Sequence, residues 1–257
     1  FKEPIIEAGK LTGIKVEVNG EMNELRAKLI VDCSGLDSIV RVSLPNDYGI
    51  ETDPITPQEM LYVILKYVDN IMEEDFPKGL NFYPFHKTFC NPSYGAGAIL
   101  GVGQPGSYKY AETVQEEFLK ERFAKYHYEI IKVKKGRTPF RRPPFTLVAD
   151  NFIVLGDAAF TTKPFSGEGV SSGFTACQIA VDELNKLLPQ GQLSQQDLWT
   201  INVRYFTDQG AKFAELLAQV PAAAELSRKD VNYLFKKDII FSGKALSNMN
   251  RNFENKI

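Results

Sequence analysis

The feature that most constrains the fold is a strand, a glycine-containing loop and a long helix in direct succession. Phe152–Leu155 is an uninterrupted apolar run, as expected for a parallel strand that is covered on both faces. The segment Gly156–Val170 follows with the sequence GDAAFTTKPFSGEGV, and a helical pattern of apolar residues begins after it. This succession predicts an open α/β sheet with a ligand site beyond the carboxyl end of the strand.

The residues of this loop suit a flat, hydroxylated ligand. Asp157 can accept hydrogen bonds from sugar-type hydroxyls, and Pro164 stiffens the chain. Gly167 and Gly169 carry no Cβ, so the backbone can approach a ligand closely. The helix that follows directs unpaired N–H groups and a positive dipole end toward the loop, which favours negative charge by about 0.3–1 kcal/mol when exposed. An N-cap in a tight turn would explain a lone Gly-Asp pair, but the complete string favours a ligand site.

The helix predicted after the loop carries one apolar stripe at three- and four-residue steps, which we expect to face the core. A helical pattern continues from Ser194 onward. The residues of the stripe are Phe174, Cys177, Val181, Leu184 and Leu188.

The chain before this region reads as β-structure. Ile14–Val18 alternates strictly and is followed by Asn19-Gly20, a strong hairpin signal. A second strand is expected over Leu25–Val31, ending in a turn at Asp32. Further along the chain, the pattern predicts strands at Leu61–Leu65, Leu80–Phe85, Ala96–Val102 and Glu129–Val133, and a helix over Ala111–Tyr126.

The string Gly156–Val170 resembles the GDAA-xxxx-P-xx-GEG flavin loop of the superfamily that contains aromatic hydroxylases, geranylgeranyl reductases and electron-transfer-flavoprotein dehydrogenases. There the aspartate binds the ribityl chain of FAD, and the loop from the proline to the second glycine lines the isoalloxazine ring. Phe160 departs from the pattern, which usually has glycine, and its ring could narrow the ring pocket or pack beneath the loop. The resemblance implies FAD and the cofactor-binding residues Gly156, Asp157, Ala158, Pro164, Gly167, Glu168, Gly169 and Val170.

A second string, Asp32–Arg41, resembles the DxxG-xx-S-xx-R segment of the same superfamily. The resemblance adds Gly35, Ser38 and Arg41 to the cofactor-binding set. In the hydroxylase branch an aspartate precedes the glycine and assists FAD and NADPH, whereas this chain has Ser34. That difference favours the reductase or dehydrogenase branches.

These resemblances imply an α/β (α+β overall) fold with a three-layer FAD/NAD(P)-binding domain. Residues 1–50 and 146–190 would belong to that domain, 51–145 to an inserted β-rich substrate domain, and 191–257 to a helical C-terminal region. The superfamily begins with a strand, a GxGxxG turn for the pyrophosphate and an acid for the ribose. Gly95, Gly97 and Gly101 have a different spacing, and we expect Gln104-Pro105-Gly106 to break the chain without a helix after it. We therefore assign these glycines to β-structure. We expect a domain that is incomplete at its N-terminus and that binds FAD weakly or not at all on its own.

The expected function is that of an FAD-dependent oxidoreductase that reduces or dehydrogenates an apolar, isoprenoid-type substrate. An FAD-dependent monooxygenase or halogenase, and a non-catalytic binding protein with the same fold, are the alternatives. No catalytic acid or base is assigned, because His86 has no visible partner in the sequence. Nearby aromatic residues belong either to the core or to an apolar substrate pocket: Phe82, Tyr83, Phe85 and Phe89.

Charge and cysteine content narrow the partners. A net charge of −2 gives no general attraction to nucleic acid. Three scattered cysteines and two histidines form no zinc pattern, and we expect small buried thiols in a reduced, cytoplasmic setting. No apolar run is long enough to span a membrane. A basic run predicts either an exposed strand edge or a contact for a prenyl diphosphate, a ferredoxin or a membrane surface. Its residues are Lys132, Lys134, Lys135, Arg137, Arg141 and Arg142. NAD(P)H is an alternative electron donor to a ferredoxin-type protein.

Overall fold

The computed structural model describes residues 1–72, 74, 76–77, 81–83, 88–94, 97–164, 167–224 and 228–237. The chain divides into two compact units, Phe1–Leu217 and Ala218–Ile257. The second unit contains the end of helix α4 (Ala211–Ala224) and helix α5 (Arg228–Lys236). The described residues contain no helix with the length and apolarity needed to cross a membrane.

The N-terminal segment of the first unit forms an antiparallel sheet of three strands in the order β1-β2-β3. The predicted hairpin is confirmed, with Asn19 and Gly20 at φ of 54° and 84°, the left-handed values that a tight two-residue turn requires. The prediction of one strand over Leu25–Val31 is wrong. The chain leaves β3 and joins another sheet, because the Ile30 N–H bonds to the Asn151 carbonyl. The strands are β1 (Glu3–Glu7), β2 (Lys10–Val18), β3 (Glu21–Arg26) and β4 (Ile30–Asp32).

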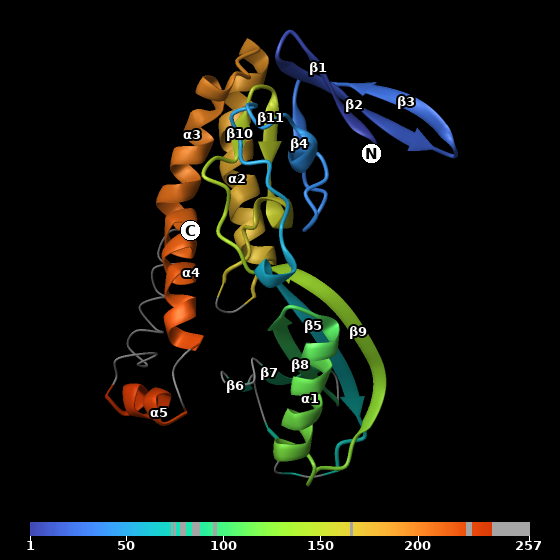
Figure 1. The fold of residues 1–257 in the computed structure, drawn as a ribbon, viewed down its shortest axis with the longest axis vertical. Coiled ribbons are helices and arrows are strands. Elements are labelled where there is room, and N and C mark those ends of the chain that lie inside the picture. Colours follow the sequence, from blue (N-terminus) through green and yellow to red (C-terminus); the bar gives the residue numbers. More distant parts are fainter. Residues whose placement is uncertain are drawn as a thin grey trace. The chain divides into compact units, whose positions relative to one another are not determined.

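The second sheet places the two recognised strings side by side. Its order is β10-β11-β4, with β11 (Phe152–Val154) parallel to β4 and antiparallel to β10 (Val148–Ala149). All three residues of β11 are fully buried, as the apolar run predicts. Helices α2 (Val170–Leu187) and α3 (Gln195–Tyr205) run beside β10 and β11 (Figure 1).

The apolar stripe predicted for α2 is not its buried face. Phe174 is 72% exposed and Val181 is 50% exposed. Small side chains face the core instead, because Ala176 and Ala180 let the helix approach the sheet closely. The predicted Cys177 and Leu184 are half-buried at the margin, and Leu188 is exposed. The buried residues of α2 are Ser172, Ala176, Ile179, Ala180 and Glu183.

A five-stranded antiparallel sheet, in the order β6-β7-β8-β5-β9, occupies the middle of the chain. Helix α1 packs against β8 and β5 (Figure 1). Phe118 of this helix and Phe123 directly after it join Val68 and Leu100 in an apolar cluster. The bounds are β5 (Met60–Asp69), β6 (Asn81–Tyr83), β7 (Thr88–Tyr94), β8 (Gly97–Pro105), α1 (Tyr108–Arg122) and β9 (Glu129–Pro139).

The glycines of this region lie in β-structure where the structure describes them. Gly97 and Gly101 belong to β8, as predicted. The expectation that no helix follows Gly106 is wrong, since α1 begins at Tyr108 behind the N-cap Ser107. A serine cap is enough to begin a helix directly after the turn.

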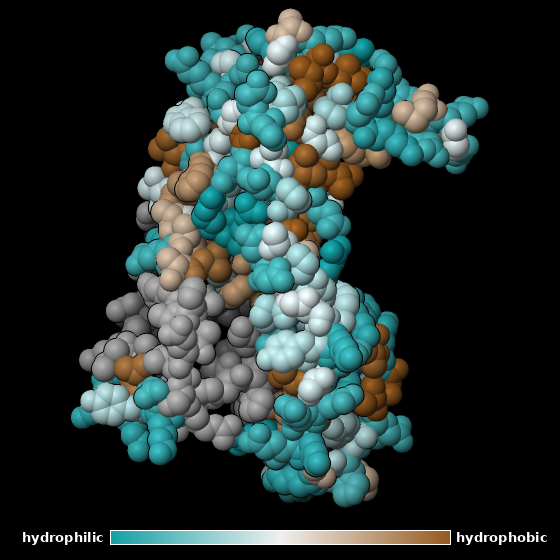
Figure 2. All heavy atoms as spheres, viewed as in Figure 1, coloured by the Kyte–Doolittle hydropathy of each residue, from teal (hydrophilic) through white to brown (hydrophobic). Residues whose placement is uncertain are grey.

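Most of the basic run lies on β9, the edge strand of the five-stranded sheet. Lys135 pairs with Glu112, and Arg137 pairs with Asp37. Three aliphatic side chains of the same strand, Ile130, Ile131 and Val133, are exposed, and hydrophobic surface is visible over this region in Figure 2. The edge position agrees with the first interpretation of the run, while a partner contact stays a prediction.

Several residues named from the sequence fall at gaps in the described chain. Phe85 and His86 lie outside the described residues, and for Phe82, Tyr83 and Phe89 the structure describes only the strands that carry them. Their role as core or substrate pocket therefore stays open.

Candidate functional site

The two strings meet at the carboxyl edge of the second sheet. Val154 of β11 lies opposite Asp32 of β4, and the Leu155 N–H donates to the Asp32 carbonyl at 3.0 Å. The turn Gly156–Ala159 therefore leaves the sheet directly beside the turn that follows β4. Adjacent carboxyl ends of parallel strands are where open α/β sheets bind ligands.

Asp157 lies at the start of the first loop and already has one partner. Its Oδ1 accepts a hydrogen bond from the Thr162 hydroxyl at 2.8 Å, and the side chain is half-buried. A Cβ on Gly169 would lie 2.7 Å from the Thr162 Oγ1 and 3.4 Å from the Asp157 Oδ1. The loop thus returns so closely to the carboxylate that glycine is required at 169. Thr162 is a hydrogen-bond partner of Asp157 that the sequence did not predict.

The remainder of the loop is closed by its own backbone. The Lys163 N–H donates to the Glu168 carbonyl and the Gly167 N–H to the Lys163 carbonyl, both at 3.0 Å. The Lys163 ammonium also pairs with the Glu168 carboxylate at 2.8 Å. Gly167 has φ of +72°, a conformation that other residues rarely adopt. Pro164 is buried beneath this turn.

Helix α2 begins where the loop ends, and no side chain of the described residues caps it. Gly169 is its N-cap residue, and the Gly173 N–H makes the first intrahelical bond, to the Gly169 carbonyl. The N–H groups of the preceding turn are therefore the unpaired donors of a helix start. Val170 lies at this start with 76% of its surface exposed. Together these groups can hold an anionic or hydrogen-bond-accepting edge of a ligand.

The second string is organised around the buried carboxylate of Asp32. Its oxygens accept from the Ser34 N–H and the Arg41 N–H, both at 2.9 Å, and from the Ser38 hydroxyl at 3.3 Å. Ser38 and Arg41 are fully buried, so their side chains hold this turn from within. Gly35 has φ of +83° in the same turn. Cys33 is exposed, contrary to the prediction of a buried thiol, because it alternates with the inward-facing Asp32.

Arg41 is a buried cation without a carboxylate in hydrogen-bonding range among the described residues. Its Nε donates to the Ser38 Oγ at 2.9 Å and its Nη1 to the Glu51 carbonyl at 2.5 Å, while its Nη2 has no partner. Burial lowers the pKa of Arg41, and the nearby Arg141 lowers it further. Buried charges are normally paired, so this arginine is held at a cost in free energy.

The Phe160 ring is buried between two arginines. It is 1% exposed, and the guanidinium carbons of Arg41 and Arg141 lie 5.1 Å and 5.4 Å from its ring centroid. These are cation–π distances. Its φ of 52° is left-handed, which is unusual for a bulky residue. The ring therefore joins the two strings and one arginine of the basic run.

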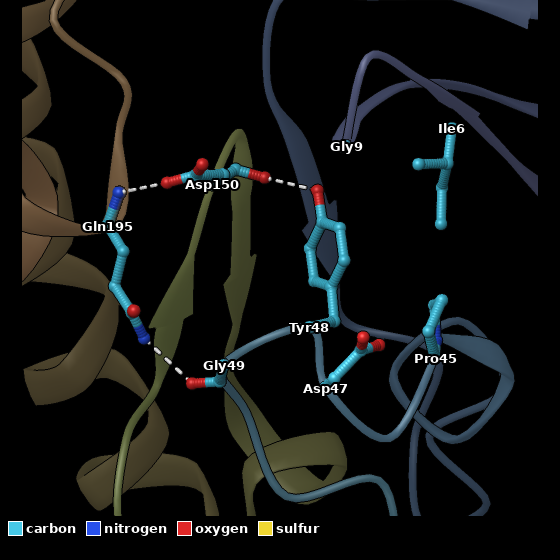
Figure 3. A pocket seen from close by; sticks show the side chains of 8 residues that line it. All are labelled: Ile6, Gly9, Pro45, Asp47, Tyr48, Gly49, Asp150 and Gln195. Atoms are coloured by element: carbon cyan, nitrogen blue, oxygen red, sulfur yellow. Dashed lines mark hydrogen bonds between the residues drawn. The ribbon is translucent and has the colours of Figure 1, made fainter.

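A pocket of about 390 Å³ lies at the opposite end of the second sheet (Figure 3). Asp150 precedes β11 there, whereas Asp157 follows it. The Tyr48 hydroxyl donates to the Asp150 carbonyl at 2.7 Å, and the Gln195 N–H donates to the Asp150 carboxylate at 2.6 Å. Because these polar groups are hydrogen-bonded to one another, we interpret the pocket as a structural contact between the N-terminal sheet and the start of α3.

No protein-family model matches the sequence. The chain is 30% identical to the digeranylgeranylglycerophospholipid reductase of Sulfolobus acidocaldarius, over 93% of this chain and 55% of that protein. The geranylgeranyl bacteriochlorophyll reductase-like protein of Thermoplasma acidophilum has a similar structure, with a TM-score of 0.74 and 15% identity over 90% of this chain and 59% of the other. The myxobacterial FAD-dependent halogenase CndH gives a TM-score of 0.62 at 16% identity, over 92% and 60% of the two chains.

The fold is similar to the folds of these two proteins, in agreement with the predicted α/β class. The sequence is similar to those of digeranylgeranylglycerophospholipid reductases, which agrees with the predicted resemblance to geranylgeranyl reductases. The chain spans about half the length of the curated relatives it matches.

Proposed function

We propose that this chain is part of an FAD-dependent oxidoreductase that reduces an apolar isoprenoid substrate. The observation that carries the proposal is the meeting of the two loops at the carboxyl ends of β4 and β11, beside the uncapped start of α2. The relatives' names specify a lipid with isoprenoid chains, which is such a substrate. When bound, the flavin would supply the hydride chemistry, and the protein would supply position and charge.

The described residues fit the ring and ribityl end of FAD. The Asp157 carboxylate would accept from a ribityl hydroxyl, and the glycine at 169 lets the loop return close to that carboxylate. The first turn of α2, at Val170, would stabilise negative charge on the reduced ring. Gly35, Ser38 and Arg41 would hold the neighbouring turn. The proposed cofactor-binding set is completed by Gly156, Ala158, Pro164, Gly167 and Glu168.

The proposed organisation assigns residues 1–50 and 146–190 to the flavin domain. Residues 51–145, which contain the five-stranded sheet, would form the substrate domain, and 191–257 a helical C-terminal region. The electron donor is left open between NAD(P)H and a ferredoxin-type protein. Peripheral contact with a membrane would suit a lipid substrate.

An FAD titration followed by flavin fluorescence tests the proposal. We expect saturable quenching by the chain, and an affinity at least about ten-fold weaker in Asp157→Ala, since a charged hydrogen bond contributes about 1.5–3 kcal/mol. Asp47→Ala removes an exposed carboxylate at the distant pocket and should bind FAD like the wild type. Equal FAD affinities in all three proteins would count against the site.

Product analysis separates the reductase from its alternatives. Stoichiometric oxygen consumption with hydroxylation or halogenation of a substrate would favour a monooxygenase or halogenase, the class represented by the structural neighbour CndH. Flavin binding without turnover of any isoprenoid lipid would favour a non-catalytic protein.

A further inference from the structure

Helices α3 and α4 are joined by a π turn over Phe206–Gly210. Such turns insert an extra residue into a helix and are frequent at functional sites. Gln209 lies in this turn and is 2% exposed. Its Nε2 donates to the Ser172 carbonyl of α2 at 2.9 Å, a buried hydrogen bond between residues 37 positions apart.

Ser172 carries this contact to the loop beside Asp157. Its hydroxyl lies within hydrogen-bonding distance of the carbonyls of Glu168, at 3.1 Å, and Gly169, at 3.2 Å. Ser172 is itself 2% exposed. A chain of buried polar groups therefore runs from the π turn through the first turn of α2 to the end of the loop.

The π turn sets the direction of Gln209. Relative to an uninterrupted α-helix, one extra residue rotates every following side chain by about 100° about the axis. The fully buried ring of Tyr205 packs against the wide turn. A Cβ on Gly210 would lie 2.5 Å from this ring, so the position requires glycine. The sequence Tyr205–Gly210 therefore specifies a local geometry that directs a carboxamide at α2.

A second carboxamide on the same helix holds the other side of the loop. Asn202, 5% exposed, accepts the Leu147 N–H at 2.9 Å and lies 3.4 Å from the Phe145 carbonyl as a donor. These residues lead into β10, which pairs with β11. Asn202 thus holds the backbone before the loop, and Gln209 holds the first turn of α2 after it.

We propose that Gln209 is a positioning residue for the flavin site. Through Ser172 it fixes the first turn of α2, whose unpaired N–H groups face the place proposed for the ring. The inference rests on the proposed function for the identity of the ligand. The hydrogen bond and the ordering of the loop can be tested without it.

The test compares Gln209→Leu with Gln115→Leu, a matched loss of a buried carboxamide. Gln115 is 1% exposed and donates to the Ile64 and Leu100 carbonyls in the five-stranded sheet. Amide hydrogen exchange over Gly169–Gly173 should quicken about ten-fold in Gln209→Leu, the effect of losing one buried hydrogen bond. It should change less than about two-fold in Gln115→Leu. Gln209→Asn keeps the polarity but shortens the reach, and should resemble Gln209→Leu.

FAD affinity supplies the second readout. We expect binding about ten-fold weaker in Gln209→Leu and unchanged in Gln115→Leu. Equal exchange of the Gly169–Gly173 amides in both leucine variants would overturn the inference, and so would wild-type exchange in Gln209→Asn. If the wild type and Asp157→Ala bind FAD equally, the proposed cofactor site fails, while the exchange data still decide whether Gln209 holds the helix start.

Discussion

The edge of the second sheet and the five-stranded sheet use different means of stabilisation. At the sheet edge, Asp32 and Arg41 are buried among backbone donors and acceptors, and Phe160 and Ser38 hold left-handed backbone. The five-stranded sheet instead has an aromatic and aliphatic core around Phe118 and ion pairs at its surface. Strained backbone and buried charge persist where the surrounding structure specifies them, and they concentrate at functional sites. The contrast therefore supports the proposed site independently of the motifs.

Removing the buried carboxylate should give the largest effect. Asp32→Ala leaves the Ser34 and Arg41 N–H groups without their acceptor and Arg41 without the nearest opposing charge, so we expect a loss of about 3–5 kcal/mol in the free energy of unfolding. Urea denaturation measures it. Lys135→Ala removes an exposed ion pair and should cost less than about 1 kcal/mol. Similar losses in both variants would remove the distinction between the two regions.

Phe160 tests whether the backbone strain is real. Phe160→Ala should cost about 3–5 kcal/mol, because it empties a buried site and leaves a Cβ at left-handed φ. Phe160→Gly should be more stable than Phe160→Ala by about 1 kcal/mol, since glycine adopts this φ without strain. Thermal and urea unfolding of the two variants provide the comparison. If alanine were the more stable, the left-handed conformation would not be costly.

The fold was predictable wherever the local signal agreed with burial. The buried strand β11, the Asn19-Gly20 hairpin and the strands β5, β8 and β9 follow from apolar runs, alternation and turn residues. Strand β7 was not predicted. The sequence did not predict which face of α2 is exposed, because the large apolar residues of this helix point outward while its alanines pack on the sheet. Side-chain size alone did not indicate that close approach mattered more than apolar area at this interface.

The sequence predicted which two strings belong to the candidate site, but not the hydrogen bonds and packing contacts that connect them. The two strings lie together because parallel strands share an edge, which sequence order and the strand pattern indicate. Arg141 and Gln209 carry no local signal, since they reach Phe160 and the first turn of α2 through the tertiary fold. Thr162 lies within the loop itself, but its sequence position does not show that it bonds to Asp157. Phe160 departs from the superfamily's loop pattern in the sequence, and in the structure its backbone is left-handed.

Two glycines give a matched comparison of smaller size. Gly169→Ala places a Cβ 2.7 Å from the Thr162 Oγ1 and should cost about 1–3 kcal/mol, and Thr162→Ala in the same chain should recover part of it. Gly136→Ala on β9 meets nothing within 4 Å and should lie within about 0.5 kcal/mol of the wild type. Chemical denaturation decides between them. A neutral Gly169→Ala would show that the loop moves away from Asp157 freely.

The smallest expected effect concerns Glu51, which connects the two regions through Arg142. Burial acts to raise the pKa of Glu51, but the hydrogen bonds from Arg142 and the Phe145 N–H outweigh it, and the pKa lies below its ordinary value of 4.5. The unfolded chain therefore takes up this proton first as the pH falls. The stabilisation is complete above about pH 5 and is lost as the pH drops through the lowered pKa.

Because the pair of Glu51 and Arg142 is partly exposed, we expect this stabilisation to be less than about 1 kcal/mol, measured as the free energy of unfolding between pH 3 and 7. Glu51→Gln keeps an acceptor for Arg142 without the titration, so its curve should be flatter by that amount. Parallel curves for the two proteins would mean that Arg142 holds the Glu51 side chain without stabilising its charge.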